Sequence, residues 1–472
     1  MSLLVFDYWY SFRKLENGTP EYQEMEHTVN LRNADRLFKI CDHLGGYFAK
    51  FGQMASTMEQ SIPPEYTKTL AKCQDHLSSV PFSVFERVIH EDFHAKPEDL
   101  FLHVDDTPVG CASLAQVHRG VLRTGEEVAI KVQYPTVAKD TEVDLRNIEL
   151  VTKICGKVFK NFQYDWIVPK VRATVENEFN FLKEVDNMEE CRNDFLSNPS
   201  IYVPKAYREY CSSRMIVMEY IEGVKANDVE KLRRQGINPH DVGMLCVQAF
   251  GEMIFKHNYI HMDPHAGNLL VRTIPGTNKP QLVILDHGMY YHFRPGMNEQ
   301  LKNLWLAMIQ QDEEATRECC KPWNMEEYAD VFSLAMTGRT GKMNRKMGEE
   351  LSKEEMEKMR EEMIKRMRQQ DREAIEKRMK KMQTMMKNMP TEMMAVFRNQ
   401  MMLMNLMRTI GCKQYERLDE MTLLAVESSY EDSTGQIDYF QMFKLKWHLF
   451  LLRFKQFFND LIVDWYYRCS IL

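Results

Sequence analysis

The strongest constraint on the fold is a pair of short apolar stretches joined by a turn-rich linker. The first stretch is LLVR (Leu269–Arg272), the linker contains PGTNKP (Pro275–Pro280), and the second stretch is QLVIL (Gln281–Leu285). Apolar runs of this length on either side of Gly, Pro and Asn are typical of a β-hairpin. HMDPHAGN (His261–Asn268) precedes the hairpin and DHG (Asp286–Gly288) follows it. The sequence therefore predicts two polar segments that lie one hairpin apart.

The first polar segment has two chemical interpretations. On a helix, His261 and His265 would share one face, as zinc ligands do, with Asp263 between them in the sequence. Pro264 lies between them, and proline disfavours helical geometry at the residue before it, so a loop is favoured. On a loop, Asp263 and Asn268 are five residues apart, the spacing of the catalytic Asp and the Mg²⁺-binding Asn in kinase catalytic loops. A loop without chemistry is the plain alternative.

The second polar segment strengthens the loop interpretation. Asp286 follows an apolar strand and is itself followed closely by Gly288, which is how kinases present the aspartate that binds Mg²⁺. A simple turn can also read DHG. The combination with Asp263 and Asn268 favours phosphate chemistry.

Upstream segments supply the other parts of such a site. EEVAIKV (Glu126–Val132) predicts a strand, in which Lys131 is expected to meet an anion if the strand is buried. An outward lysine on an edge strand is the alternative. GCASLAQVHRG (Gly110–Gly120) stands where a phosphate-covering loop would be, and its few glycines predict a stiff loop. MEYIEG (Met218–Gly223) predicts a linker whose backbone, near Glu219, hydrogen-bonds an adenine.

Four motifs together resemble the UbiB family of atypical kinases, also called the aarF-domain or ABC1 family. They are KFGQ (Lys50–Gln53), the segment from IPPEY to QDH (Ile62–His76), CASLAQVH (Cys111–His118), and HMDPHAGN with LDHG. Within the family, the chain most resembles the mitochondrial aarF-domain-containing kinases. The resemblance implies an α+β, protein-kinase-like bilobal fold with an N-terminal helical KxGQ segment and helical C-terminal extensions.

The resemblance also implies cofactors and site residues. The cofactors are ATP (or ADP) and Mg²⁺. The implied residues are Asp263, Lys131 and Glu184 for catalysis; Ala112, Ser113, Ala115, Gln116, Lys131 and Glu219 for the nucleotide; Lys50, Gly52, Gln53 and Glu178 for the KxGQ segment; and Asn268 and Asp286 for the metal. Glu184 is the implied ion-pair partner of Lys131, a role that spacing alone does not select.

Three positions depart from the family's pattern. The acidic ExD motif reads Glu178-Phe179-Asn180, so its second acid is an amide, and a charge contact there becomes a neutral hydrogen bond. Ala266 stands where proline is common, and Ala115 where many members have glycine. Both of these are minor.

Composition and patterning predict the organisation of the 472-residue chain. The expected segments are 1–35 as an N-terminal arm, 36–95 as the helical KxGQ segment, 96–222 as the small lobe, 223–340 as the large lobe, 341–410 as a Met-rich charged helical segment, and 411–472 as C-terminal helices. In SKEEMEKMREEMIKRMRQQ (Ser352–Gln370), methionines recur at helical spacing. We favour packing of this stripe over a lipid- or partner-binding surface. The aromatic segment Met442–Leu472 contains scattered lysines and arginines, and it is either an interfacial membrane helix or buried.

Charge and the N-terminus bear on partners and location. A net charge of −7 argues against nucleic acid as a partner. The N-terminus is not a clear transit peptide, because Asp7 interrupts its apolar start. The mitochondrial location is therefore implied by the resemblance alone.

Two function classes fit these observations. The first is a Mg²⁺-dependent ATPase or phosphotransferase acting on a small-molecule or lipid-related substrate in mitochondrial lipid or quinone homeostasis. It is not expected to be a typical protein kinase, because the KxGQ helices would occupy the groove that binds peptides. The second is a catalytically weak, nucleotide-dependent switch or scaffold, that is, a pseudokinase.

Overall fold

The computed structural model describes residues 2–13, 15, 19–44, 48, 52, 55–56, 63–75, 80–111, 114–135, 141–143, 145–147, 149–150, 172, 179–337, 385, 389–429, 440, 443–444, 447, 450–451 and 454. The chain divides into two compact units, Met1–Glu189 with Pro204–Ile221 (unit 1) and Glu190–Val203 with Glu222–Leu472 (unit 2). Each unit combines helices with a β-sheet, so the predicted α+β class is confirmed.

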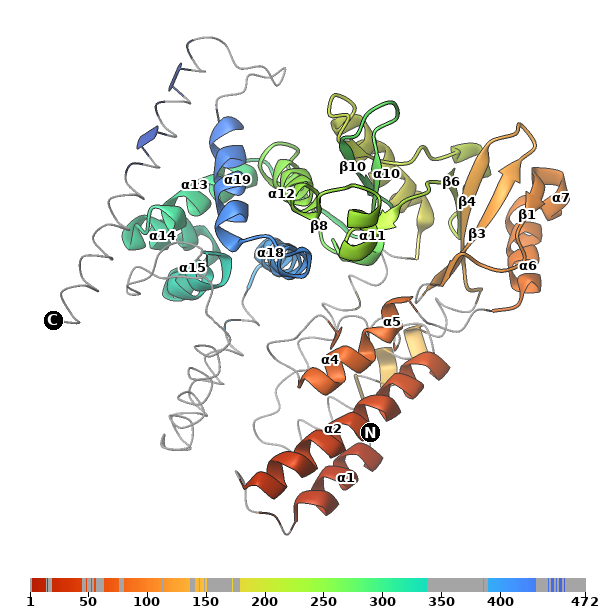
Figure 1. The fold of residues 1–472 in the computed structure, drawn as a ribbon, viewed down its shortest axis with the longest axis horizontal. Helices are drawn as coiled ribbons and strands as arrows, with labels where there is room; N and C mark the ends of the chain where they lie inside the picture. The colour runs from red at the N-terminus through yellow and green to blue at the C-terminus, as the bar shows by residue number, and fades with distance from the viewer. Residues whose placement is uncertain are drawn as a thin grey trace. The chain divides into compact units, whose positions relative to one another are not determined.

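Helices form the described part of the N-terminal region of unit 1. They are α1 (Ser2–Phe12), α2 (Pro20–Leu44), α4 (Pro64–Leu70) and α5 (Lys72–Asp75), and α2 packs on both α1 and α4 (Figure 1). Asp7 on α1 forms ion pairs with Arg32 and Arg36 of α2, at 2.5 and 2.7 Å. The region predicted as an arm is therefore largely helical, and residue 35 lies inside α2.

A five-stranded antiparallel sheet follows in unit 1. Its order is β1-β3-β4-β6, with β2 paired to β3. The strands are β1 (Phe101–Val104), β2 (Gly110–Cys111), β3 (Ala115–Leu122), β4 (Glu127–Gln133) and β6 (Met215–Glu219). Apolar residues of helix α6 (Phe82–Phe93) pack on one face of the sheet, where Phe85, Val88 and Ile89 are fully buried. The short helix α7 (Pro97–Leu100) leads into β1. The strand predicted from EEVAIKV is confirmed as β4.

Helix α10 (Phe181–Asp194) begins in unit 1. The Asn180 side-chain oxygen accepts a hydrogen bond from the Leu182 N–H at 3.1 Å, at the start of the helix. Glu184 lies in its first turn.

Unit 2 contains the predicted hairpin. Strands β9 (Leu269–Thr273) and β10 (Pro280–Ile284) pair antiparallel, in a four-stranded sheet of order β5-β10-β9-β7. The outer strands are β5 (Ile201–Tyr202) and β7 (Val224–Lys225), and β5 is parallel to β10. Strands β8 (Tyr259–His261) and β11 (Tyr290–His292) form a separate pair. The hairpin thus joins the two polar segments, as predicted.

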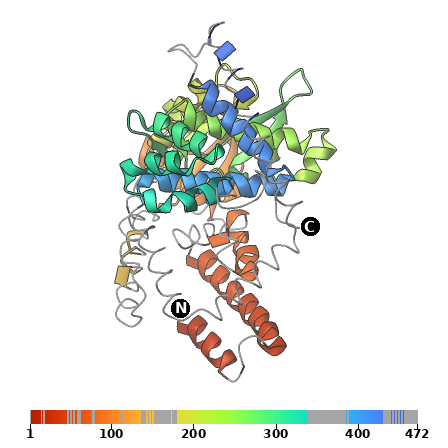
Figure 2. The ribbon, with the colours of Figure 1, turned by 90° about the vertical axis from the view of Figure 1, so that its left-hand side faces the viewer.

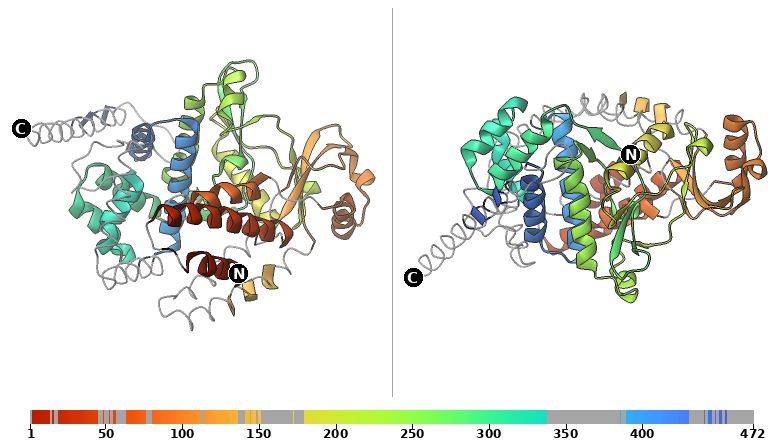
Figure 3. Two further views of the ribbon diagram at one scale, coloured as in Figure 1. Left: turned by 60° about the horizontal axis from the view of Figure 1, so that its bottom comes forward. Right: turned by 90° about the horizontal axis from the view of Figure 1, so that it is seen from above.

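Helices make up the rest of the described part of unit 2. They are α11 (Val229–Arg234), α12 (Pro239–Phe255), α13 (Met297–Ile309), α14 (Glu313–Cys320), α15 (Ala329–Thr337), α18 (Thr391–Ile410) and α19 (Gln414–Glu427). Figures 2 and 3 show α18 and α19 in blue, and both pack on α12, which is green. The contact is close at Gly251, where a Cβ atom would lie 2.5 Å from Leu424 of α19. The absence of a side chain at Gly251 therefore leaves room for the Leu424 side chain at this contact.

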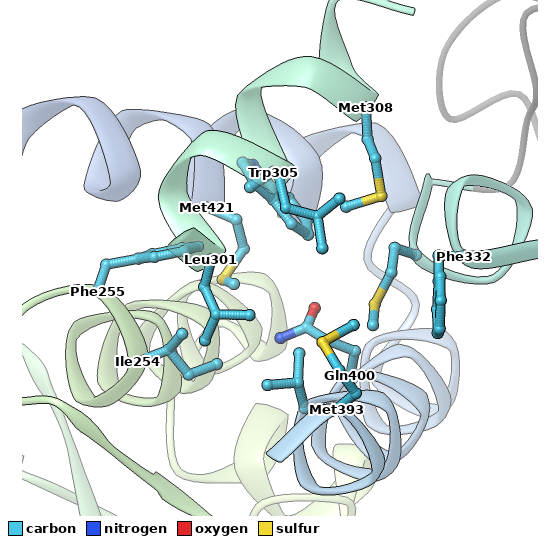
Figure 4. Close-up of a pocket in the computed structure, with 12 residues that line it drawn as sticks. Ile254, Phe255, Leu301, Trp305, Met308, Phe332, Met393, Gln400 and Met421 are labelled. Carbon is cyan, nitrogen blue, oxygen red and sulfur yellow. The ribbon is translucent and has the colours of Figure 1, made fainter. Parts of the chain in front are cut away.

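An apolar cavity of 20 Å³ lies among α12, α13, α15, α18 and α19 (Figure 4). The side chains around it include Phe255, Trp305, Met393 and Met421. A space of this size holds roughly one water molecule, so a lipid tail does not fit. The methionines that line the cavity therefore act as core residues of unit 2.

None of the helices described is both long and apolar enough to cross a membrane.

Candidate active site

Lys131 lies in the middle of β4 and forms an ion pair with Glu184 of α10. The distance from Nζ to Oε1 is 2.6 Å, and the two side chains are 13% and 5% exposed. Nζ also lies 5.1 Å from the centre of the Phe181 ring. A shielded ammonium requires a compensating charge, and Glu184 supplies one. The pairing implied by the resemblance is therefore present.

Gln116 and His118 on β3 are buried and hydrogen-bonded to each other. The Gln116 side-chain oxygen accepts from the Val80 N–H at 3.1 Å. His118 Nδ1 lies 2.8 Å from the Asp105 carbonyl, which can only accept, so Nδ1 carries the proton. His118 Nε2 then accepts from the Gln116 amide at 3.0 Å, and burial lowers the pKa of His118. The Gln116 side chain is thus hydrogen-bonded to other residues of unit 1.

The structure describes some of the other residues that were predicted to bind the nucleotide or to belong to the KxGQ segment. Ala115 begins β3 and is buried. Glu219 ends β6, and its N–H donates to the Lys205 carbonyl at 2.9 Å. Gly52 lies among buried thiols, since a Cβ there would be 2.7 Å from Cys73 Sγ and 3.2 Å from Cys41 Sγ. Five further predicted residues lie outside the described ones: Lys50, Gln53, Ala112, Ser113 and Glu178.

Unit 2 brings Asp263, Asn268 and Asp286 together. The Asn268 side-chain amide donates to the Asp263 carbonyl at 3.5 Å. The Asn268 carbonyl in turn accepts from the Leu285 N–H at 3.0 Å, immediately before Asp286. These contacts arise because β9 and β10 are antiparallel, so the residue before β9 meets the residues after β10. The three residues predicted from spacing therefore share one end of the hairpin.

His261 is fully buried and connects the two polar segments. Its Nδ1 accepts a hydrogen bond from the Asp263 N–H at 3.0 Å, so Nδ1 carries no proton. Its Nε2 then donates to the Asp286 carbonyl at 2.9 Å. Burial lowers the pKa of His261, which favours this neutral form. Because both ring nitrogens are occupied, His261 is not available to a metal.

The alternative zinc interpretation has no further support. His265 Nδ1 accepts from the Gly267 N–H at 3.1 Å. Among the residues that the structure describes, no group of three or more His, Cys, Asp or Glu side chains could hold a metal ion. The loop interpretation of HMDPHAGN is the one that the structure supports.

The chemistry of Asn268 and Asp286 fits Mg²⁺. Asn268 uses its nitrogen in the bond to Asp263, so its side-chain oxygen is the atom that a metal would meet. One carboxylate oxygen of Asp286 accepts from the Gly288 N–H at 2.9 Å, which orients the group. Both residues are partly exposed. Mg²⁺ prefers oxygen ligands of these types and keeps several waters, so a partly open pair suits it.

Two contacts to the HMDPHAGN segment were not predicted from the sequence. Arg398 of α18 forms an ion pair with Asp263, with Nη2 3.0 Å from Oδ1. Asn399, the next residue, is fully buried and donates to the His261 carbonyl at 2.7 Å. Arg398 follows Asp263 by 135 residues in sequence, and Asn399 follows His261 by 138. Nothing in the local pattern of either segment indicates the contact.

Comparison with known proteins adds independent information. Residues 72–320 match the ABC1 atypical kinase-like domain. The chain is 35% identical over 355 residues to AarF domain-containing protein kinase 1 of Xenopus laevis, a match that covers 75% of this chain and 68% of that protein. It is 33% identical to AarF domain-containing kinase 1 of Drosophila melanogaster, over 70% of this chain and 63% of that protein. It is 29% identical to the probable serine/threonine-protein kinase abkD of Dictyostelium discoideum, in a match that covers 87% of this chain and 58% of that protein. The matched regions span about two thirds of these relatives or less.

Proposed function

Because this chain belongs to the ABC1 atypical kinase-like family, we propose that it is a Mg²⁺-dependent ATPase or phosphotransferase acting on a small-molecule or lipid-related substrate. The observation that carries the proposal is the grouping of Asp263, Asn268 and Asp286 at one end of the β9–β10 hairpin. The ion pair of Lys131 with Glu184 supports it from unit 1.

In the proposed reaction, an oxygen of the acceptor attacks the γ-phosphorus of ATP. The bond from that phosphorus to the β–γ bridging oxygen breaks, and ADP leaves with the electron pair. Asp263 orients the acceptor hydroxyl or water and takes its proton. Lys131 contacts the nucleotide phosphates, and Asn268 and Asp286 would hold the Mg²⁺, which neutralises phosphate charge.

The second candidate is a pseudokinase, in which nucleotide binding switches or scaffolds a partner. Its support is the segment before β4, where Ala115 and neighbouring small residues stand in place of most glycines. Its further support is the amide of Asn180, which replaces an acid of the ExD motif. The two candidates differ only in whether bound ATP is turned over.

Two substitutions distinguish the candidates. Asp286→Asn is expected to lose most of the melting shift given by Mg-ATP, because an amide does not balance the metal charge. At a Mg-ATP concentration about a hundred times the dissociation constant, binding stabilises the folded wild-type protein by about 2.7 kcal/mol. Its melting shift is therefore measurable. Asp263→Ala is expected to keep the shift while turnover falls by about two to four orders of magnitude.

Each result of this experiment has a clear meaning. A wild-type melting shift with hydrolysis above the Asp263→Ala background supports the enzyme. A shift without such hydrolysis supports the pseudokinase. If the wild-type protein does not respond to Mg-ATP, the kinase-like assignment of the site is wrong.

We further propose a role in mitochondrial lipid or quinone homeostasis, which rests on the family resemblance. Lipid and metabolite profiling of cells that lack the protein tests this role. The chain is not expected to phosphorylate generic peptides. Stoichiometric transfer to a peptide library would contradict that expectation.

The C-terminal segment is proposed to contact a membrane surface. The described aromatic residues recur at helical spacing and are exposed: Phe440 (65%), Phe443 (66%), Trp447 (55%), Phe450 (54%) and Phe454 (51%). Lys444 lies 4.5 Å from the Phe440 ring centre. Aromatic anchors with interspersed basic residues suit an anionic lipid surface.

Vesicles with and without anionic lipid test the proposal by co-sedimentation. Replacing Trp447 and Phe450 with Ser is expected to reduce pelleting with the anionic vesicles. Trp9→Ser, at a residue of α1 that is 63% exposed, is the matched control. Equal pelleting of the C-terminal variant and the wild type would remove the membrane proposal.

A further inference from the structure

Helix α18 contacts the catalytic loop through two consecutive side chains. Arg398 Nη2 lies 3.0 Å from Asp263 Oδ1, and Asn399 donates to the His261 carbonyl at 2.7 Å. The helix packs on β8, which ends at His261, and on α12 (Figure 1). The contact is therefore made by a packed helix that approaches the loop at two points.

The position of Arg398 is fixed by its surroundings. Asn399 and Gln400, which follow it, are buried, and Gln400 Oε1 accepts from Arg417 of α19 at 2.6 Å. Arg417 also donates to the Met336 carbonyl of α15 at 2.6 Å. A polar network satisfied in this way holds a helix in one register. Arg398 is thereby presented to Asp263 by a rigid support.

The catalytic loop carries no cation of its own. From Met262 to Leu269 the sequence is MDPHAGNL, without lysine or arginine. Its histidine, His265, uses Nδ1 to accept from the Gly267 N–H. The cation that meets Asp263 is instead the guanidinium of Arg398. It comes from α18, which lies outside residues 72–320, the part of the chain that matches the family's domain.

We propose that Arg398 is a positioning residue of the phosphoryl-transfer site, and this inference rests on the proposed function. The guanidinium holds the Asp263 carboxylate in the orientation in which it meets the acceptor hydroxyl or water. The side chains of Arg398 and Asp263 are 31% and 20% exposed, so the pair is partly shielded from water. A charge-assisted hydrogen bond in such a place constrains a carboxylate more than a solvated pair does. Helix α18 then belongs to the active site and not only to the core.

The test compares Arg398→Met and Arg398→Lys with Arg408→Met. Arg408 is an exposed residue of the same helix and serves as the control. Arg398→Met is expected to keep the Mg-ATP melting shift and the KM for ATP, while kcat falls by about 10- to 100-fold, as for a misplaced catalytic group. Arg398→Lys retains the charge and is expected to recover part of the loss. Arg408→Met is expected to match the wild type.

Two further measurements separate positioning from a purely structural role. Added millimolar guanidinium is expected to raise the turnover of Arg398→Met and not that of Arg408→Met. In the Asp263→Ala background, Arg398→Met is expected to cause no additional loss, because the two residues act as one unit.

The outcomes are distinct from those of the proposed function. If the wild type hydrolyses ATP and Arg398→Met does so equally fast, Arg398 has no positioning role. If Arg398→Met and Arg398→Lys lose turnover only in step with nucleotide binding and thermal stability, the contact is structural and the inference is wrong. If the wild type neither binds nor hydrolyses Mg-ATP, the proposed function fails and this inference fails with it.

Discussion

The imidazole of His261 donates from Nε2 to the backbone carbonyl of Asp286, 2.9 Å away. Its other nitrogen accepts from the Asp263 N–H at 3.0 Å. One buried ring is therefore hydrogen-bonded to the backbone of both Asp263, the proposed catalytic residue, and Asp286, the proposed metal ligand. The same two bonds prevent the ring from binding a metal.

Replacing His261 with Phe is expected to reduce both stability and turnover. Phe fills the space but leaves the Asp263 N–H and the Asp286 carbonyl without this partner, which costs about 1–3 kcal/mol for each buried group. Urea unfolding and ATP hydrolysis measure the two effects. His43→Phe, at an exposed residue of α2, is the control. Wild-type turnover in His261→Phe would contradict the role of the ring.

Replacing Glu184 with Gln is expected to destabilise the protein by about 3–5 kcal/mol, because the shielded Lys131 ammonium loses its counter-charge. The double variant Lys131→Met, Glu184→Gln is expected to be more stable than Glu184→Gln alone, since both charges are then absent. Chemical denaturation measures the coupling. Additive effects of the two substitutions would show that the 2.6 Å contact carries no coupling energy.

The folded protein is expected to lose stability in mild acid because of His257. Burial, with a smaller effect from Lys256, lowers its pKa from 6.5 to about 4, so between these values the unfolded chain binds a proton that the folded chain does not. Acidification therefore favours unfolding, by about 1.4 kcal/mol for each pH unit in that window. Burial raises the pKa of the neighbouring Asp194, which acts in the opposite direction.

Comparison with His257→Asn isolates the histidine. The variant is expected to lose less stability than the wild type between pH 7.5 and 5.5, as measured by urea unfolding. Identical pH dependence in the two proteins would show that His257 is not the cause.

Arg417 is expected to be important for the stability of unit 2. It is 1% exposed, and it donates to the Gln400 and Gln414 side chains and to the Met336 carbonyl. Burial lowers its pKa to about 9, so the charge is retained at neutral pH. Arg417→Met is expected to cost about 1–3 kcal/mol for each of these acceptors that is left unsatisfied. Arg408→Met is again the control, and equal stability of the two variants would contradict the role of the network.

The sequence predicted those parts of the site that depend on neighbouring residues. The hairpin follows from its apolar runs and turn residues, and it brings Asp263 and Asp286 to the same end of the pair of strands. Lys131 was found because a lysine is unusual within a β-branched strand. Only the family resemblance identifies Glu184, since spacing does not select it among the many acids of its segment.

Other parts of the site depend on tertiary packing that the sequence does not encode locally. Arg398 reaches Asp263 because α18 packs on α12 and β8, and no spacing rule links the two residues. The spacing of His261 and His265 also fits a zinc site, because spacing does not reveal which atoms the ring nitrogens of His261 meet. Its actual partners are backbone groups, which carry no sequence signal.

The close packing around Gly52 affects how variants of the KxGQ motif should be interpreted. An added methyl group there would collide with the thiols of Cys73 and Cys41, which belong to α5 and α2. Gly52→Ala is therefore expected to lower the stability of the fold, and low cellular abundance of the variant would be its first sign. A loss of activity after that change says nothing about ATP chemistry unless the amount of folded protein is measured at the same time.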